Sequence, residues 1–210
     1  MRINADIGFI HIPKTGGQSI EKCLLFEVAG TREQALLRPN NDPSMGPPRL
    51  AHLTQSEYAK YYDYRPRKWF SLIRNPADRF VSEVKFRGLS TSEAEVYLNK
   101  IIFNLLEDDY VAGEDYLRHV IPQVNYIQDR SQVLLMRFED FFLDPERHLS
   151  SVLGRTLNAK VPHIRPRATQ RKIDKIKITR TSLRKLEEHY AADFELWKKC
   201  APQSWTYWAT

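Results

Sequence analysis

A short apolar run followed by a glycine turn, near the start of the chain, constrains the fold more than any other feature. Residues 7–12 (IGFIHI) are rich in β-branched side chains and are stopped by Pro13, which is typical of a strand buried in a parallel sheet. The turn at residues 13–19 (PKTGGQS) leads into apolar residues at helical spacing. Such a turn exposes unpaired backbone N–H groups at the positive end of a helix dipole. The sequence therefore predicts a site for a phosphate or sulfate group.

The alternation of strand and helix continues along the chain. Further strands are predicted at residues 68–73 and 133–136. Helices are predicted at residues 54–62, from Pro76, at 94–106, from Pro145 to about Gly154, and as one long helix at 182–199. A chain of 210 residues with 42% hydrophobic content can bury a large core. We expect one α/β domain over residues 1–210, with a parallel sheet flanked by helices on both faces.

A second anion-binding pattern follows the predicted strand at 68–73. Arg74 falls at the carboxyl end of that strand, where ligands gather in open α/β sheets, and Ser82 lies two turns into the next helix. An arginine and a hydroxyl beside the first turn can hold a second phosphate. A nucleotide donor that is phosphorylated at both its 3′ and 5′ positions requires two such sites.

Together, the two motifs resemble those of the sulfotransferases that use PAPS (3′-phosphoadenosine 5′-phosphosulfate), especially the carbohydrate type similar to heparan and uronyl 2-O-sulfotransferases. HIPKTGGQS at residues 11–19 resembles the 5′-phosphosulfate loop of that family, and RNPADRFVS at 74–82 resembles its 3′-phosphate motif, in matching order and spacing. Weaker resemblances follow at 122–127, 137–140 and 190–196. The resemblance implies a P-loop-like α/β fold, PAPS as donor, PAP as product and no catalytic metal.

The resemblance also implies which residues contact the donor. On the 5′ side they are Lys14, Thr15, Gly16, Gly17, Gln18 and Ser19, and on the 3′ side Arg74 and Ser82. Gln18 departs from the family pattern, because members commonly carry Thr or Ser at that position. The amide of Gln18 can still donate to a phosphate, but its reach differs.

His52 and Lys14 are the candidate catalytic residues. By analogy with phosphoryl transfer, sulfuryl transfer needs in-line attack by a hydroxyl and neutralisation of charge on the leaving oxygen. LAHLT at residues 50–54 resembles the family segment that carries a catalytic histidine, so His52 is the predicted general base. Lys14 is expected to stabilise the leaving phosphate. Asp63 and Glu83 are the alternative bases.

The net positive charge of the chain comes from one segment. Residues 160–185 contain ten Lys and Arg residues against one acid, Asp174. Such a segment binds nucleic acid, forms a solvated face, or closes on an anionic ligand. We favour the third interpretation, in which a basic loop binds the 3′ phosphate of the donor or an acidic glycan; its residues are Arg165, Arg167, Arg171 and Lys172.

Two other function classes stay open. One is a non-catalytic nucleotide- or glycan-binding module that kept the fold. The other is a P-loop nucleotide kinase, which is disfavoured because the loop GxxxxGK[ST] places its lysine after the last glycine, whereas Lys14 precedes both glycines.

The remaining features indicate a cytoplasmic protein without a metal site. Cys23 and Cys200 have neither zinc-ligand spacing nor a disulfide pattern, so we expect buried thiols. No apolar stretch approaches the ~20 residues that cross a bilayer. The expected partners are the nucleotide donor and a hydroxyl acceptor of the carbohydrate class, not nucleic acid.

Overall fold

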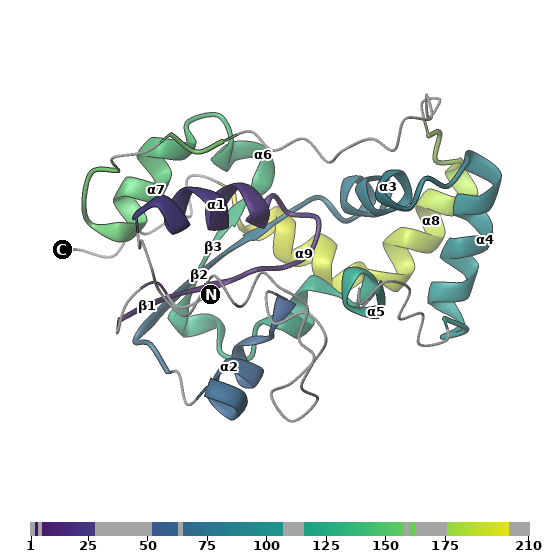
Figure 1. Cartoon of the computed structure of the whole chain (residues 1–210). Helices are drawn as coiled ribbons and strands as arrows, with labels where there is room; N and C mark the ends of the chain where they lie inside the picture. The colour runs from purple at the N-terminus through teal and green to yellow at the C-terminus, as the bar shows by residue number, and fades with distance from the viewer. Residues whose placement is uncertain are drawn as a thin grey trace.

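A three-stranded parallel sheet forms the centre of the protein. The computed structural model describes residues 3, 6–27, 52–62, 65–106, 116–157, 160–162 and 176–201. The strands β1 (Ile7–Ile10), β2 (Lys68–Ile73) and β3 (Val133–Arg137) pair in that order (Figure 1). All three strand predictions are confirmed, but β1 ends at Ile10, two residues earlier than predicted, because the chain leaves the ladder there and enters the glycine turn.

The described residues also form nine α-helices. They are α1 (Gly17–Glu27), α2 (Gln55–Tyr62), α3 (Pro76–Arg87), α4 (Thr91–Ile102), α5 (Tyr116–Val120), α6 (Phe138–Phe141), α7 (Pro145–Leu153), α8 (Arg180–His189) and α9 (Ala191–Lys199). Two short 3₁₀ helices, Gln123–Tyr126 and Arg130–Gln132, precede β3. In the described part of the chain, no helix is both long and apolar enough to span a bilayer.

The two faces of the sheet bury two separate cores. Side chains alternate along each strand, so Phe9, Phe70 and Met136 pack on one face with residues of α1, α6 and α7. Ile10 and Ile73 pack on the opposite face with residues of α2 and α9. The α/β class and the prediction of helices on both faces are thereby confirmed (Figure 1).

A third core joins helices beyond the end of the sheet. It is formed by α3, α4 and α8, which lie together on the right in Figure 1, and its buried members include Val84, Leu98 and Leu186. The two cysteines lie in the sheet cores as buried thiols, as predicted.

The helix predicted from Pro76 is confirmed as α3, and the helix predicted at 94–106 is present as α4 but begins at Thr91 and ends at Ile102. The side chain of Asn75 accepts hydrogen bonds from the backbone N–H groups of Ala77 (2.9 Å) and Asp78 (3.4 Å), and Pro76 occupies the first turn of α3. Ser90 and Glu93 form a reciprocal capping box at the start of α4.

The predicted long helix at 182–199 is wrong, because it is two helices that meet at Tyr190. The backbone of Tyr190 leaves the helical region (φ −105°, ψ 28°), and its hydroxyl donates to the carbonyl of Val120 at 2.5 Å. Leu186 of α8 packs in the third core, whereas Leu196 of α9 packs on the sheet. The sequence does not show the break, because apolar residues recur at the same helical spacing in both helices although the two helices pack into different cores.

Candidate functional site

The turn between β1 and α1 has no room for a side chain at two of its positions, Gly16 and Gly17. Lys14 (φ 69°) and Gly16 (φ 85°) both have positive φ, and α1 begins at Gly17. A Cβ atom at Gly17 would lie 2.1 Å from Cδ2 of His11, and one at Gly16 would lie 2.6 Å from the Phe142 ring. Both glycines are therefore required by this turn, whose open N–H groups at the start of α1 fit an anion.

The side chains of the turn offer fewer hydrogen-bond donors to an anion than the sequence predicted. The Thr15 hydroxyl donates to the carbonyl of Ile12 at 2.8 Å, so its hydrogen is used within the turn. Any contact from Thr15 to an anion then comes from its backbone N–H. Ser19 is buried, and its N–H donates to the carbonyl of Gly16 at 3.0 Å, whereas Gln18 is exposed.

Arg74 brings the second motif against the first. It follows the carboxyl end of β2, and its Nη1 donates to the carbonyl of Lys14 at 3.3 Å. Its guanidinium lies over the Phe138 ring, 4.4 Å from Cζ to the ring centroid. The Nε atom is buried and has no hydrogen-bond partner among the described residues. A partly buried cation with an unused donor fits an anionic ligand. Burial lowers the pKa of Arg74, and the carboxylates of Asp78 and Glu139 oppose that shift.

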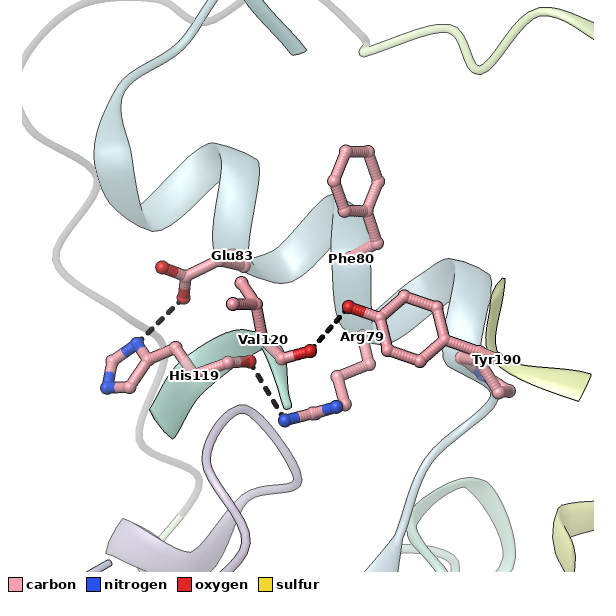
Figure 2. Close-up of a pocket in the computed structure, with 7 residues that line it drawn as sticks. Arg79, Phe80, Glu83, His119, Val120 and Tyr190 are labelled. Carbon is pink, nitrogen blue, oxygen red and sulfur yellow. Dashed lines mark hydrogen bonds and ion pairs between the residues drawn. The ribbon is translucent and has the colours of Figure 1, made fainter. Parts of the chain in front are cut away.

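Arg79 is a structural partner of the turn that sequence reasoning did not single out. Its side chain is buried in α3, and its Nε donates to the carbonyl of Pro13 at 3.1 Å. Its two terminal nitrogens donate to the carbonyls of Ile121 (2.9 Å) and His119 (2.8 Å). Figure 2 shows Arg79 reaching from α3 toward His119. Its position inside the motif at 74–82 was the available signal, but its partners lie 40 to 66 residues away.

His52 lies between two other histidines. Its ring is edge-on to those of His11 (centroids 4.8 Å apart) and His119 (5.2 Å apart). The backbone carbonyl of His52 accepts a hydrogen bond from Nη1 of Arg118 at 3.0 Å. Arg118 also forms a two-pronged ion pair with Glu57 of α2, at 2.8 and 2.5 Å. This pair fixes the segment that carries His52 to α2.

Each flanking histidine is bound to a buried glutamate. His11 Nδ1 is hydrogen bonded to Glu21 of α1 at 2.8 Å, and His119 Nδ1 to Glu83 of α3 at 2.8 Å (Figure 2). Glu83 also accepts from Nε of Arg87 at 2.8 Å. The sequence analysis did not predict these pairs.

Glu83 is an unsuitable base in this environment. Burial alone would raise the pKa of the Glu83 carboxyl. The hydrogen bond from His119, the charges of His119 and Lys14, and the hydrogen bond from Arg87 outweigh burial and lower that pKa to about 2. A carboxylate this acidic holds a proton poorly near neutral pH.

The side chain of Lys14 lies against α3, the helix that carries Glu83. Its Nζ is 3.9 Å from the centroid of the Phe86 ring on α3, and that ring lies 5.5 Å from the ring of His119. The catalytic candidates Lys14 and His52 therefore belong to one cluster connected through His119. Ser82 is partly buried on α3, in the same helix as Glu83 and Phe86.

Several predicted residues lie outside the described part of the chain. They are Asp63, Arg165, Arg167, Arg171 and Lys172. Among the described residues, no group of three or more His, Cys, Asp or Glu side chains is arranged to hold a metal ion.

The comparisons with known proteins identify the family. No curated protein matches the chain. The family model described as the sulfotransferase domain matches residues 32–206. This span covers most of the chain and contains His52, Arg74 and Ser82, and it begins after the glycine turn. The chain therefore belongs to the sulfotransferase domain family.

Proposed function

We propose that this protein transfers the sulfuryl group of PAPS to a hydroxyl group of a carbohydrate. The observation that carries the proposal is the hydrogen bond from Arg74 to the carbonyl of Lys14. This hydrogen bond connects two parts of the site. One is the glycine turn, which resembles a 5′-phosphate loop, and the other is the half-buried guanidinium of Arg74, which is suited to a second phosphate. Two adjacent anion sites match a donor that carries phosphate at its 3′ and 5′ positions.

In this proposal the donor lies along the carboxyl edge of the sheet. The backbone N–H groups of residues 15–18 and the Lys14 ammonium bind the 5′ phosphosulfate. Arg74 and Ser82 bind the 3′ phosphate. The predicted closure of Arg167 and Arg171 over the donor remains a prediction, since these residues lie outside the described part.

The proposed reaction is a single in-line displacement. The acceptor oxygen attacks sulfur while the bond between sulfur and the 5′-phosphate oxygen breaks, which gives a sulfate ester and PAP. His52 takes the proton of the attacking hydroxyl, and the Lys14 ammonium stabilises the negative charge on the leaving phosphate. A neutral imidazole suits this role because its ordinary pKa of about 6.5 lies near working pH.

The carbohydrate acceptor is proposed from motif resemblance. The stretches at residues 11–19, 74–82 and 50–54 are those that resemble carbohydrate sulfotransferases. The hydroxyl that is sulfated is best found by a direct assay of transfer from radiolabelled PAPS to a panel of glycans, phenols and simple alcohols. Label transfer to glycans supports the proposal, whereas transfer to phenols alone contradicts the acceptor class, and no transfer to any acceptor contradicts the activity.

A further inference from the structure

Three short motifs have no part in the donor and acceptor contacts proposed above. They lie at residues 122–127, 137–140 and 190–196, far apart in the sequence. In the fold, one side chain from each motif reaches the loop that follows β2, either directly or through one neighbour. This convergence indicates that the three motifs help to fix the position of Arg74.

Gln123 holds both backbone groups of Arg74. Its Oε1 accepts from the Arg74 N–H at 2.9 Å, and its Nε2 donates to the Arg74 carbonyl at 2.9 Å. The side chain of Gln123 is 0% exposed, so no water competes with these bonds. A primary amide is the side-chain group that can both accept from and donate to one residue's backbone in this way.

Asp193 of α9 holds Gln123 in turn. Its two carboxylate oxygens accept from the N–H groups of Gln123 (2.7 Å) and Val124 (2.9 Å). Asp193 is 1% exposed and therefore pairs its charge with these donors rather than with solvent. The 3₁₀ helix that carries Gln123 is fixed to α9 as a result.

Glu139 fixes the neighbouring residue. Its Oε1 accepts from the N–H of Asn75 at 2.9 Å, and its Oε2 accepts from Nε1 of Trp197 in α9 at 3.1 Å. Phe138, one residue earlier, lies under the Arg74 guanidinium. The backbone and the side chain of Arg74 are therefore held from two directions by residues that α9 supports.

We propose that Gln123 and Asp193 are positioning residues that set the preference of the site for a donor bearing a 3′ phosphate. The inference rests on the proposed function, in which Arg74 binds that phosphate. A guanidinium forms its strongest bonds with phosphate as a rigid fork, so its affinity depends on where its backbone is fixed. A fixed Arg74 also loses less conformational freedom when the phosphate binds.

The test is the Kd for AMP divided by the Kd for PAP, both measured by titration calorimetry. A high ratio means that the site prefers the ligand with the 3′ phosphate. These ligands differ by the 3′ phosphate, so the ratio reports that phosphate alone. Gln123→Met keeps the side-chain length and removes both hydrogen bonds to Arg74. We expect it to lower the ratio about tenfold, the effect of weakening one charge-assisted contact, while AMP affinity changes less than about twofold.

Gln55→Met is the matched control. Gln55 is also a buried glutamine, and its Oε1 accepts from the N–H groups of Gln128 and Asp129, both at 2.9 Å, away from Arg74. It should lower the melting temperature as Gln123→Met does and leave the ratio unchanged. If Gln123→Met weakens AMP and PAP equally, its role is structural and the inference is overturned.

Asp193→Asn gives a second variant if Gln123→Met does not fold. Asp193 binds the two N–H groups with two different oxygens, and in Asn one of these oxygens is replaced by an NH₂ group, which is a donor and cannot accept from the N–H that it faces. Removal of a negative charge would by itself strengthen phosphate binding, so a fall in the ratio for Asp193→Asn has positioning as its cause. An unchanged or raised ratio contradicts the inference.

Arg74→Ala separates the inference from the proposed function. If Arg74→Ala lowers the ratio and the Gln123 variant does not, the proposed function stands and the inference fails. If Arg74→Ala leaves the ratio unchanged, the assignment of the 3′ phosphate to Arg74 is wrong, and the inference that rests on it fails. In the double variant, Gln123→Met should lower the ratio no further, because its effect passes through Arg74.

Discussion

His52 is surrounded by side chains whose own positions are fixed. His11 and His119 contact its ring, and each is tied to a carboxylate in a different helix. The carbonyl of His52 is held by Arg118. Such contacts fix the position of the imidazole. A fixed position favours a general base, because proton transfer from a hydroxyl depends on hydrogen-bond distance.

Replacement of His52 should separate chemistry from donor binding. We expect His52→Ala to keep its PAP affinity and melting temperature while turnover falls roughly 10²–10⁴-fold, the usual contribution of a positioned acid–base group. Lys14→Ala should instead weaken donor binding and lower turnover together, because it removes charge at the leaving phosphate. Turnover is measured with labelled PAPS and affinity by titration calorimetry.

His148→Ala is the control for that comparison. His148 lies on α7, with its ring 5.9 Å from that of Phe141, and its loss should change turnover less than about twofold. Near wild-type turnover by folded His52→Ala would assign His52 a structural role.

Glu83 should make stability depend on pH in acid. Its pKa in the folded protein is about 2, below the ordinary value of 4.5, so the carboxylate stabilises the fold above pH 4.5. That contribution is lost as pH falls from 4.5 toward 2. Glu83→Gln should cost on the order of 3 kcal/mol near pH 7, because it breaks a buried ion pair.

The measurement is the difference in unfolding free energy between wild type and Glu83→Gln across pH 3–7. The difference should be largest near pH 7 and should shrink below pH 4.5. Glu95→Gln, at an exposed position on α4, controls for the loss of one negative charge. A difference that is constant over this range would contradict the role of Glu83 as a buried anion.

At the scale of single elements, local signals decided which predictions succeeded. The start of α3 was predictable because Asn75 and Pro76 are a cap and a first-turn residue next to each other in sequence. The contacts of Gln123 and Arg79 could not be predicted from the sequence, because each side chain binds backbone groups that lie 40 or more residues away. The break at Tyr190 was missed because its hydroxyl bonds to Val120, which sequence periodicity does not report.

The N-caps of α3 and α4 offer a comparison of stability with function. Asn75→Ala and Ser90→Ala should each cost about 1 kcal/mol, the usual loss for a cap. Only Asn75→Ala should also weaken PAP binding, because Asn75 adjoins Arg74 and its N–H is held by Glu139. Denaturant unfolding and calorimetry of both variants check this. Equal PAP affinities would show that the cap and the donor site are independent.

For the whole molecule, PAP should stabilise the fold without added metal. A ligand that binds only the folded state adds about 2.7 kcal/mol at a concentration 100 times its Kd. For a chain of 210 residues this corresponds to a rise of roughly 5–10 °C in Tm. Thermal unfolding with PAP and a chelator measures the effect, with ATP and Mg²⁺ as the comparison. A shift with ATP and Mg²⁺ but none with PAP would favour a kinase.

The support of Arg74 by α9 also has a consequence for the order of events on the ribosome. A chain emerges from its N-terminus, so Arg74 leaves the ribosome more than 110 residues before Asp193 and Trp197. The three strands and the glycine turn are all made before α9 exists. A nascent chain stalled before residue 190 would hold the whole sheet sequence and yet lack the anchor for the Arg74 loop. The proposed donor site therefore becomes complete only late in synthesis.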